Sequence, residues 1–369
     1  MKYYIIAGEA SGDLHGSNLI KALFKQDKNA TIRCWGGDLM ENAGATLVKH
    51  YKELAFMGFV EVIANIPTIF KNIAFCKKDI EAFQPDVVVF IDYSGFNLRI
   101  AKWAKQHKFR TNYYISPQVW ASRSSRVEKI KRDVDMMNVI LPFEKDFYAK
   151  HNYKVNFVGH PLLDAIADRK QVNEANFRKE NKLGYKKIIA LLPGSRKQEI
   201  VKMLSVMLSL VDDFKEYQFV IAGAPSQDFE FYQQFIKTDN VQFINNKTYD
   251  LLSVSFAALV TSGTATLETA MFKIPQVVCY KGSAITFAIA KRIITLKFIS
   301  LVNLIMDKEV VTELIQSDFN KKKLTKELIK ILDDKHRENL FLEYYELEKI
   351  LGGKGASTES ARLIIEGLQ

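Results

Sequence analysis

Two Gly-containing turns in the second half of the chain carry residue types that bind phosphates and sugars. The first lies in Lys187–Ile200, K-I-I-A-L-L-P-G-S-R-K-Q-E-I, where a buried-strand run enters a turn and a helical pattern opens at about Glu199. Such a turn presents free backbone N–H groups and the positive end of a helix dipole. Arg196, which follows Ser195 in this turn, adds a fork of donors suited to a phosphate. No Gly-Lys-Ser/Thr follows, so it is not a Walker loop. An ordinary tight turn with a solvated Arg is the alternative.

The second turn follows the strand-like run in A-A-L-V-T-S-G-T-A-T-L-E, residues 257–268. Gly263 and Ala265 are small enough for a ligand to approach the backbone, and Thr264 is the expected N-cap of the next helix. Glu268 falls one helical turn further on, where a carboxylate can accept hydrogen bonds from sugar hydroxyls. Two helix starts, one with an Arg and one with a Glu, favour a nucleotide diphospho-sugar site over two plain turns.

An acid ends a buried strand in the first half of the chain. Residues 87–97 read V-V-V-F-I-D-Y-S-G-F-N, so Asp92 follows five apolar residues and is the only carboxylate of the stretch. A buried acid is costly unless it has a task, and the carboxyl ends of such strands face the ligand. Asp92 is therefore the candidate general base, although capping the next helix or pairing with a Lys remains an alternative.

Two further turns of the first half carry polar side chains. The turn G-E-A-S-G-D-L-H-G, residues 8–16, lacks G-x-G-x-x-G spacing and a matched acid, which argues against a dinucleotide. Its Glu9, Ser11 and Asp13 are expected to face a ligand beyond the strand ends, unless Asp13 serves as a helix cap. In S-P-Q-V-W-A, residues 116–121, Gln118 and Trp120 either form a wall for a sugar or seal the turn.

The remaining metal and acid–base signals are weak. Only His15 and His160 among the histidines fall at strand-end turns, and His160 beside Pro161 indicates a hinge. The D-x-D match at Asp133 and Asp135 precedes a strand, so it is interpreted as chance. No other cluster has metal-ligand spacing, and a mechanism without metal or cofactor is expected.

The order of strand-like and helix-like runs predicts the α/β class. A chain of 369 residues suggests about two domains. We expect two doubly wound parallel-sheet domains of the Rossmann type facing a cleft, at residues 1–163 and 164–344, with a C-terminal helix in 345–369 that can pack back on the first domain. The expected strands are Tyr3–Ala7, Thr31–Trp35, Val87–Ile91, Thr111–Ile115, Met137–Leu141, Val155–Val158, Ile188–Leu192, Gln218–Ala222, Val241–Ile244, Ala258–Val260 and Gln276–Tyr280.

Charge and apolar stretches point to an anionic partner. The net charge is +10 and the pI is about 9.2, but no RNA-binding motif is present, so nucleic acid ranks last. Residues 54–76 are either core helices or an apolar patch for lipid, and 284–306 form a basic amphipathic stretch suited to an anionic membrane. The three cysteines share no spacing and the apolar start is too short for a signal peptide, so a cytoplasmic protein is expected.

Read in order, these stretches resemble one family, the lipid A disaccharide synthases, over essentially the whole chain. The motifs that carry the resemblance are G-E-A-S-G-D (8–13), E-L-A-F-M-G-F-V-E-V (53–62), I-D-x-x-x-F-N (91–97), S-P-Q-V-W-A (116–121), L-P-F-E-K-D-F-Y (141–148), F-V-G-H-P (157–161), L-L-P-G-S-R (191–196), S-G-T-A-T-L-E (262–268) and S-L-x-N-L (300–304). The chain departs from the commoner pattern at Ser94 and Gly95, where many members carry Pro and Asp, which leaves Asp92 as the only local acid. It also departs at Ser122, in place of a second Trp, and at Val302, in place of a Pro before Asn303.

The resemblance implies a GT-B glycosyltransferase that works without metal. It would transfer 2,3-diacylglucosamine from its UDP conjugate to the 6-hydroxyl of 2,3-diacylglucosamine 1-phosphate, with inversion and release of UDP. Asp92 would be the base. The implied UDP-sugar ligands are Ser195, Arg196, Gly263, Thr264, Ala265, Glu268 and Asn303. The implied acceptor-side residues are Glu9, Ser11, Gly12, Asp13, Met57, Asn97 and Gln118.

The resemblance also implies peripheral association with the inner membrane of a Gram-negative bacterium, and it leaves a homodimer open. Other readings are another UDP-sugar enzyme of the GT-B type, such as the muramyl-peptide N-acetylglucosaminyltransferase or a 2-epimerase, and a basic membrane-docking protein without catalysis. The apolar 54–76 stretch argues against an epimerase, and the polar residues at strand ends argue against a silent protein.

Overall fold

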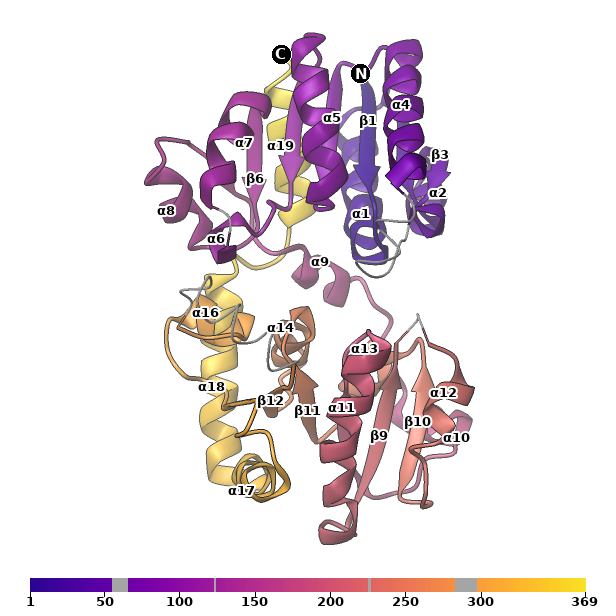
Figure 1. Ribbon diagram of the computed structural model, residues 1–369, viewed down its shortest axis with the longest axis vertical. Coiled ribbons are helices and arrows are strands. Elements are labelled where there is room, and N and C mark those ends of the chain that lie inside the picture. Colours follow the sequence, from indigo (N-terminus) through magenta and orange to yellow (C-terminus); the bar gives the residue numbers. More distant parts are fainter. Residues whose placement is uncertain (55–65, 123, 225–226, 283–296) are drawn as a thin grey trace. The chain divides into compact units, whose positions relative to one another are not determined.

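A computed structural model describes residues 1–54, 66–122, 124–224, 227–282 and 297–369 (Figure 1). Internal contacts divide the chain into unit 1, Met1–Arg169 with Leu351–Gln369, and unit 2, Lys170–Ile350. The first boundary lies at 169 instead of 163 because helix α9 (Pro161–Ala167) packs on helix α1 (Ala10–Gln26). The second lies at 350 instead of 344 because helix α18 (Asp334–Ile350) belongs to unit 2 along its whole length.

Unit 1 is built on a seven-stranded sheet in the order β3-β2-β1-β4-β5-β6-β7, with every neighbouring pair parallel. Its strands are β1 (Lys2–Ala7), β2 (Thr31–Gly36), β3 (Thr46–His50), β4 (Val87–Ile91), β5 (Arg110–Tyr114), β6 (Met136–Val139) and β7 (Asn156–Phe157). All five residues of β4 are buried, as in parallel sheets covered by helices on both faces. Alternate residues enter two cores: Val88 and Phe90 pack on one face, Val87 and Val89 on the other.

Helices complete both faces of unit 1. Besides α1 and α9 they are α2 (Asp38–Asn42), α4 (Ile66–Phe83), α5 (Ser94–Gln106), α6 (Val119–Ser122), α7 (Val127–Asp133), α8 (Glu144–Ala149) and α19 (Ala356–Glu366). Short 3-10 turns lie at Tyr51–Glu53 and Ser124–Arg126.

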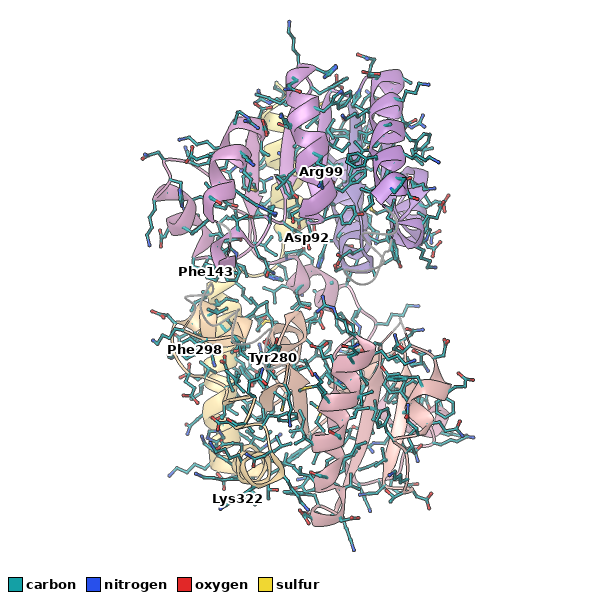
Figure 2. The ribbon with its side chains drawn as sticks, in the orientation of Figure 1. Asp92, Arg99, Phe143, Tyr280, Phe298 and Lys322 are labelled. Carbon is teal, nitrogen blue, oxygen red and sulfur yellow. The ribbon has the colours of Figure 1, made fainter. Side chains whose placement is uncertain are left out.

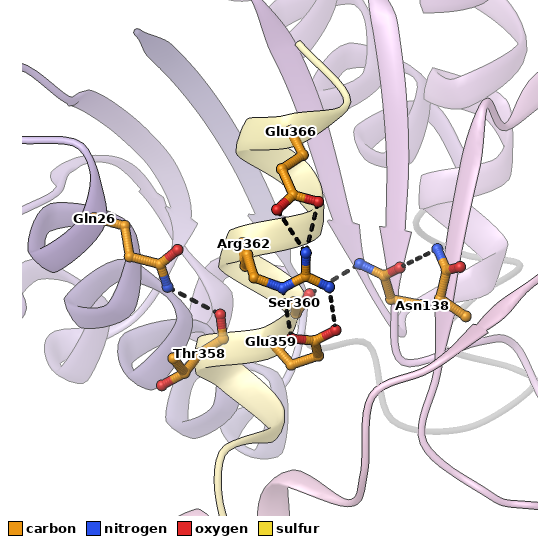
Figure 3. A network of polar contacts seen from close by, with 8 residues as sticks. Gln26, Asn138, Thr358, Glu359, Ser360, Arg362 and Glu366 are labelled. Carbon is orange, nitrogen blue, oxygen red and sulfur yellow. Dashed lines mark hydrogen bonds and ion pairs between the residues drawn. The ribbon is translucent and has the colours of Figure 1, made fainter. Parts of the chain in front are cut away.

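The C-terminal helix α19 is part of unit 1, although all of unit 2 precedes it in the chain. Gln26 of α1 donates to the Thr358 carbonyl (2.9 Å), and Asn138 of β6 donates to the Ser360 hydroxyl (3.0 Å), as Figure 3 shows. Arg362 is held along the helix by Glu359 and Glu366 (Figure 3). Buried Ala361 and Ile364 extend the core of this face.

The two segments that leave and re-enter unit 1 are bonded to each other. The His160 N–H donates to the Leu351 carbonyl (3.0 Å). The Asp164 carboxylate of α9 accepts from Gly355 N–H (2.6 Å) and Ser357 N–H (2.9 Å), at the start of α19. Both chain crossings are thereby anchored at one place on unit 1.

Unit 2 is built on a six-stranded parallel sheet in the order β10-β9-β8-β11-β12-β13. Its strands are β8 (Lys187–Leu192), β9 (Tyr217–Gly223), β10 (Val241–Asn245), β11 (Ala257–Thr261), β12 (Gln276–Tyr280) and β13 (Glu313–Ile315). Its other elements are α10 (Glu174–Glu180), α11 (Lys197–Met207), the 3-10 helix Leu208–Asp213, α12 (Phe229–Gln233), α13 (Thr248–Ser253), α14 (Thr264–Met271), α16 (Leu301–Met306) and α17 (Lys321–Leu332).

The predicted α/β class with two parallel sheets is confirmed, and each predicted strand is present within a residue or two of its expected ends. Two edge strands were missed. β3 is only half-buried and β13 has three residues, so neither shows the continuous apolar run of a central strand. No helix in the described parts of the chain is long and apolar enough to cross a bilayer.

Much of the two apolar stretches, at 55–65 and 283–296, lies outside the described residues. The remainder of the first stretch forms the start of α4, where Ile73 and Cys76 are buried and Phe70 and Phe75 are 60% and 48% exposed. That helix therefore has both a core face and an apolar exposed face.

Candidate functional site

A pocket of about 330 Å³ lies at the carboxyl edge of the unit 2 sheet, a size typical of small-ligand sites. The ends of β8, β9 and β11 and the first turns of α11 and α14 enclose it. It is lined by Leu192, Pro193, Gly194, Ser195, Arg196, Glu199, Ala222, Gly223, Ala224, Thr248, Thr261, Ser262, Gly263, Thr264, Ala265 and Glu268. The structure thus brings together six of the seven expected UDP-sugar residues: Ser195, Arg196, Gly263, Thr264, Ala265 and Glu268.

The β8–α11 turn provides the cationic side of this pocket. Gly194 adopts φ 98°, a left-handed conformation that favours glycine, and the Glu199 carboxylate lies over it. Helix α11 begins at Lys197, two residues before the expected start, with Arg196 as N-cap. Among the described residues the exposed Arg196 guanidinium has no ion-pair partner, so its donors are available to an anion beside the helix start.

The β11–α14 turn provides a second helix start. Its N-cap is Gly263, with φ 151°, and Thr264 is the first helical residue; the expectation that Thr264 caps the helix is wrong. Glycine tolerates that backbone conformation at no steric cost, whereas Thr would be strained there. Thr264 and Ala265 therefore begin the helix with backbone N–H groups that lack intrahelical acceptors.

Glu268 lies in the first turns of α14 and lines the same pocket. The Tyr249 hydroxyl of α13 donates to its Oε1 (3.1 Å). Burial raises the pKa of Glu268, and the hydrogen bond from Tyr249 opposes that rise. The second carboxylate oxygen, Oε2, can accept hydrogen bonds from ligand hydroxyls. Sequence reasoning missed Tyr249, which no local pattern marks.

Asn303 does not belong with these ligands in this structure. Its side chain is fully buried and donates to the Val311 carbonyl (2.8 Å) and Glu313 Oε1 (2.9 Å). Its Oδ1 accepts from the N–H groups of Val310 (2.8 Å) and Val311 (3.0 Å). With both ends of its side chain engaged, Asn303 holds the chain between α16 and β13, and it is not among the residues that line the pocket.

At the carboxyl edge of the unit 1 sheet, Asp92 stands in a strained turn directly after β4 (Figure 2). Asp92 and Tyr93 both have left-handed backbones, with φ 43° and 45°, which costs about 1–3 kcal/mol each for non-glycine residues. The Asp92 carbonyl is held by the Asn97 amide (2.8 Å) and the Tyr113 hydroxyl (2.5 Å). Surrounding bonds therefore impose the conformation, as is common where a side chain must be aimed.

Electrostatics at this turn suit a general base. The Asp92 residue is exposed, yet desolvation by its neighbours and the nearby Glu9 carboxylate raise its pKa to about 6, while the Tyr93 N–H opposes the shift. A carboxylate with such a pKa is ionised at neutral pH and is a stronger proton acceptor than an ordinary Asp.

Two of the expected acceptor-side residues are used inside unit 1. Asp13 is 3% exposed and caps α2 by accepting from Gly37 N–H (2.8 Å), Met40 N–H (3.0 Å) and Leu39 N–H (3.2 Å). Asn97 is fully buried and donates to carbonyls of β1, β4 and Asp92. Both side chains position the backbone of unit 1, and the capping alternative holds for Asp13, with α2 as the capped helix.

The other acceptor-side residues are placed differently. Glu9, Ser11 and Gln118 are exposed at the strand-end edge, on the β1–α1 turn and after β5. Gly12 is buried in α1, and Met57 lies outside the described residues. His160 caps α9 by accepting from Leu162 N–H (3.2 Å), in keeping with a structural role. Burial lowers the pKa of His160 to about 3 and that of His15 to about 4, so both are neutral at physiological pH.

Paired parallel-sheet units with ligand groups at their strand ends define a known class, the GT-B fold of glycosyltransferases and UDP-sugar epimerases. Solved structures that share it include UDP-GlcNAc 2-epimerase from Methanocaldococcus jannaschii in complex with UDP-GlcNAc and UDP (16% identity, all of both chains, TM-score 0.67). Another is described as the glycotransferase of kitacinnamycin (13% identity, 100% of this chain and 99% of that one, TM-score 0.69). At these identities the likeness shows the fold.

Sequence relatives narrow the class to one family. A family model described as lipid-A-disaccharide synthetase matches residues 3–361. Lipid-A-disaccharide synthases of Geobacter metallireducens (37% identity, 99% of this chain, 96% of that protein) and Syntrophus aciditrophicus (38%, 97% and 95%) match over nearly full length. The chain belongs to the lipid-A-disaccharide synthase family, which is a family of glycosyltransferases.

Proposed function

We propose that this chain joins two acylated glucosamine units. The donor is UDP-2,3-diacylglucosamine, the acceptor is 2,3-diacylglucosamine 1-phosphate, and the products are the β-1,6-linked disaccharide 1-phosphate and UDP. Family membership supports the substrates. The single structural observation that carries the chemistry is Asp92, an acid with a raised pKa in a strained and braced turn at the carboxyl edge of unit 1.

The proposed reaction is one displacement with inversion. Asp92 takes the proton of the acceptor 6-hydroxyl, and that oxygen forms a bond to C1 of the donor sugar. The bond from C1 to the diphosphate oxygen breaks, and UDP leaves with the electron pair. A positioned base contributes about 10²- to 10⁴-fold in rate.

The unit 2 pocket suits the UDP part of the donor. Arg196 and the starts of α11 and α14 oppose the negative charge that develops on the leaving diphosphate. Glu268, oriented by Tyr249, accepts from hydroxyl groups of the nucleotide sugar. These groups stabilise the departing UDP with protein donors alone, and we propose that no metal ion takes part.

We also propose that the protein works in the cytoplasm at the inner membrane, where acylated substrates reside. Two exposed phenylalanines of α4, Phe70 and Phe75, lie among the exposed Lys71 and Lys78. Peripheral membrane binding usually combines apolar groups, which insert into the bilayer, with neighbouring cations, which attract anionic lipids. The net charge of +10 adds to that attraction.

The decisive experiment measures turnover of the acylated donor and acceptor by wild type and by Asp92→Asn, with UDP affinity as a control for folding. Disaccharide from wild type, at least about a hundredfold less from Asp92→Asn, and equal UDP affinity are expected. Wild type that makes no disaccharide would overturn the proposed substrates. Full activity in Asp92→Asn would remove Asp92 as the base.

A further inference from the structure

Unit 1 buries a second acid near the carboxyl edge of its sheet, and the reaction above does not use it. Glu144, at the start of α8, is 1% exposed. No Lys, Arg or His pairs with it in the described chain. Its Oε2 accepts from the N–H groups of Ile140 (3.2 Å) and Leu141 (3.0 Å), just after β6. An unpaired buried carboxyl is costly, so its retention calls for a reason.

The other side of Glu144 faces the 116–121 segment. Burial raises the pKa of Glu144 to about 7, although the Leu141 and Ile140 N–H groups and, less strongly, the Ser116 hydroxyl and the Trp120 indole lower it. Ser116 also shares a hydrogen bond of 2.6 Å with the buried Tyr148 hydroxyl of α8. The Trp120 N–H is buried and has no hydrogen-bond partner among the described residues.

Aromatic packing ties the same two segments together. The Trp120 and Phe143 rings meet edge to face, with centroids 4.9 Å apart and planes at 83°. Contacts of this type add about 0.5–1.5 kcal/mol beyond area burial. The segments 116–121 and 141–148, two of the motifs singled out in the sequence, are therefore one packed assembly.

This assembly lies beside the Asp92 turn. Strands β4 and β5 are neighbours with Ile91 opposite Tyr114, so the chain after β5 starts next to the chain after β4. The hydroxyl of Tyr113, near the end of β5, donates to the Asp92 carbonyl and so ties the strand that leads into the 116–121 segment to the Asp92 turn. Figure 2 shows Asp92 and Phe143 at the same end of unit 1. The exposed Gln118 projects from the segment that the assembly holds.

We propose that Glu144 is a positioning residue for the acceptor, which fixes the 116–121 segment as a wall of the acceptor site beside Asp92. It acts from the start of α8, where the flanking Phe143 ring contacts Trp120 and the Tyr148 hydroxyl contacts Ser116. One carboxylate oxygen accepts from the 140–141 N–H groups, and the other is an acceptor on the side of the 116–121 segment. Glutamine offers one accepting oxygen and places an NH₂ donor on the other side. The proposal rests on the proposed function, because the wall is assigned to that acceptor.

Glu144→Gln tests this assignment with little change in shape. We expect the KM for the acceptor to rise about tenfold, with kcat changed by less than about threefold and the Kd for UDP unchanged. Asp146→Asn, an exposed acid on the same helix, is the control and should match wild type. An unchanged acceptor KM in Glu144→Gln overturns the proposal, and so does an equal loss of UDP affinity, which would indicate general damage.

A second variant and a substrate-free signal complete the test. Tyr148→Phe removes only the hydroxyl that holds Ser116 and should raise the acceptor KM in the same direction. It replaces Glu144→Gln if that variant does not fold, and an unchanged KM there counts against the proposal. The emission of Trp120, obtained as the difference from Trp120→Phe, should shift in Glu144→Gln. Because this signal needs no substrate, it shows whether the wall moves even if wild type proves inactive with the acylated pair.

Discussion

The ring of Tyr93 lies directly on the backbone of Gly8. A Cβ at position 8 would be 2.2 Å from Tyr93 Cγ, far inside van der Waals contact. Tyr93 follows Asp92 in the strained turn, so the bare backbone at the end of β1 sets the position of the base on β4.

Gly8→Ala should displace Tyr93 and with it Asp92. We expect kcat to fall at least about tenfold, and stability to fall by about 1–3 kcal/mol, the usual cost of overpacking. Gly95→Ala is the matched control, because a Cβ there meets no atom within 4 Å. Steady-state kinetics measure kcat, and chemical denaturation measures the free energy of unfolding, for both variants. Wild-type kcat in Gly8→Ala would show that the Tyr93 ring does not hold the base.

The acidic limb of the pH profile of kcat/KM should report the ionisation of Asp92. Its raised pKa, about 6, predicts activity that is lost as pH falls through that value, because only the ionised carboxylate accepts a proton. Glu9→Gln removes the neighbouring charge that raises this pKa, so the limb should move to lower pH. Glu81→Gln, an exposed acid on α4, should leave it unmoved. A limb that shifts upward in Glu9→Gln would contradict the assignment.

The raised pKa of Asp92 also makes the stability of the fold depend on pH. A carboxyl whose folded pKa lies above its unfolded value of 3.8 stabilises the fold at low pH, and that contribution is lost as pH rises through about 6. Asp92→Asn should therefore unfold at a higher temperature than wild type at pH 7.5, and the difference in unfolding temperature should be smaller at pH 4. Thermal unfolding at the two pH values checks the direction, and an advantage that grows on acidification would refute it.

Arg196 should dominate the affinity for the diphosphate. Arg196→Ala is expected to weaken UDP binding about 10- to 100-fold, the loss of one charge-assisted pair of hydrogen bonds. Arg196→Lys should recover only part of the loss, since an ammonium cannot form the bidentate fork. Lys202 is exposed on the same helix, and Lys202→Ala serves as the control. Isothermal titration calorimetry with UDP measures the affinity of each variant. Equal affinity for all three variants would place the phosphates elsewhere.

Tyr249→Phe tests how Glu268 is kept ionised. The variant removes the hydrogen bond that lowers the pKa of Glu268, so burial alone acts and the pKa rises further. UDP affinity should fall about 2- to 10-fold, in line with one hydrogen bond, and the loss should be larger at pH 5.5 than at pH 8. Tyr185→Phe, at a fully exposed tyrosine, is the control. A loss that is the same at both pH values would mean that Tyr249 does not act through Glu268.

The exposed face of α4 should govern membrane binding. Changing Phe70 and Phe75 together to Ser should lower the partition coefficient onto phosphatidylglycerol vesicles, measured by sedimentation, at least about a hundredfold, since each buried aromatic ring contributes about 1.5–3 kcal/mol. Ile329→Ser alters an exposed apolar residue of unit 2 and serves as the control. Equal binding to phosphatidylcholine vesicles would show that lipid charge plays no part.

Contiguous features could be predicted from the sequence, whereas features made by distant residues could not. The Ser195–Arg196 turn, the Gly263–Ala265 turn and Asp92 were found because strand, turn and helix follow one another in the chain. Asp13 and Asn303 have the polarity of ligand residues, but backbone groups that no spacing rule connects to them use their side chains. Tyr249 was missed because a single Tyr in a helix carries no signal until its buried partner is known. Glu144 lies in the 141–148 motif, but its burial and its bonds to the N–H groups of Ile140 and Leu141 could be known only from the structure.

The two anchored chain crossings have a consequence for synthesis. Unit 2 is one continuous run of chain, so it can fold as soon as residue 350 has left the ribosome. Unit 1 is begun first yet lacks α19, with its buried Ala361 and Ile364, until translation is nearly complete. During that interval the apolar surface that α19 will cover beside α1 is exposed, so the domain made first is the one that needs protection from aggregation longest.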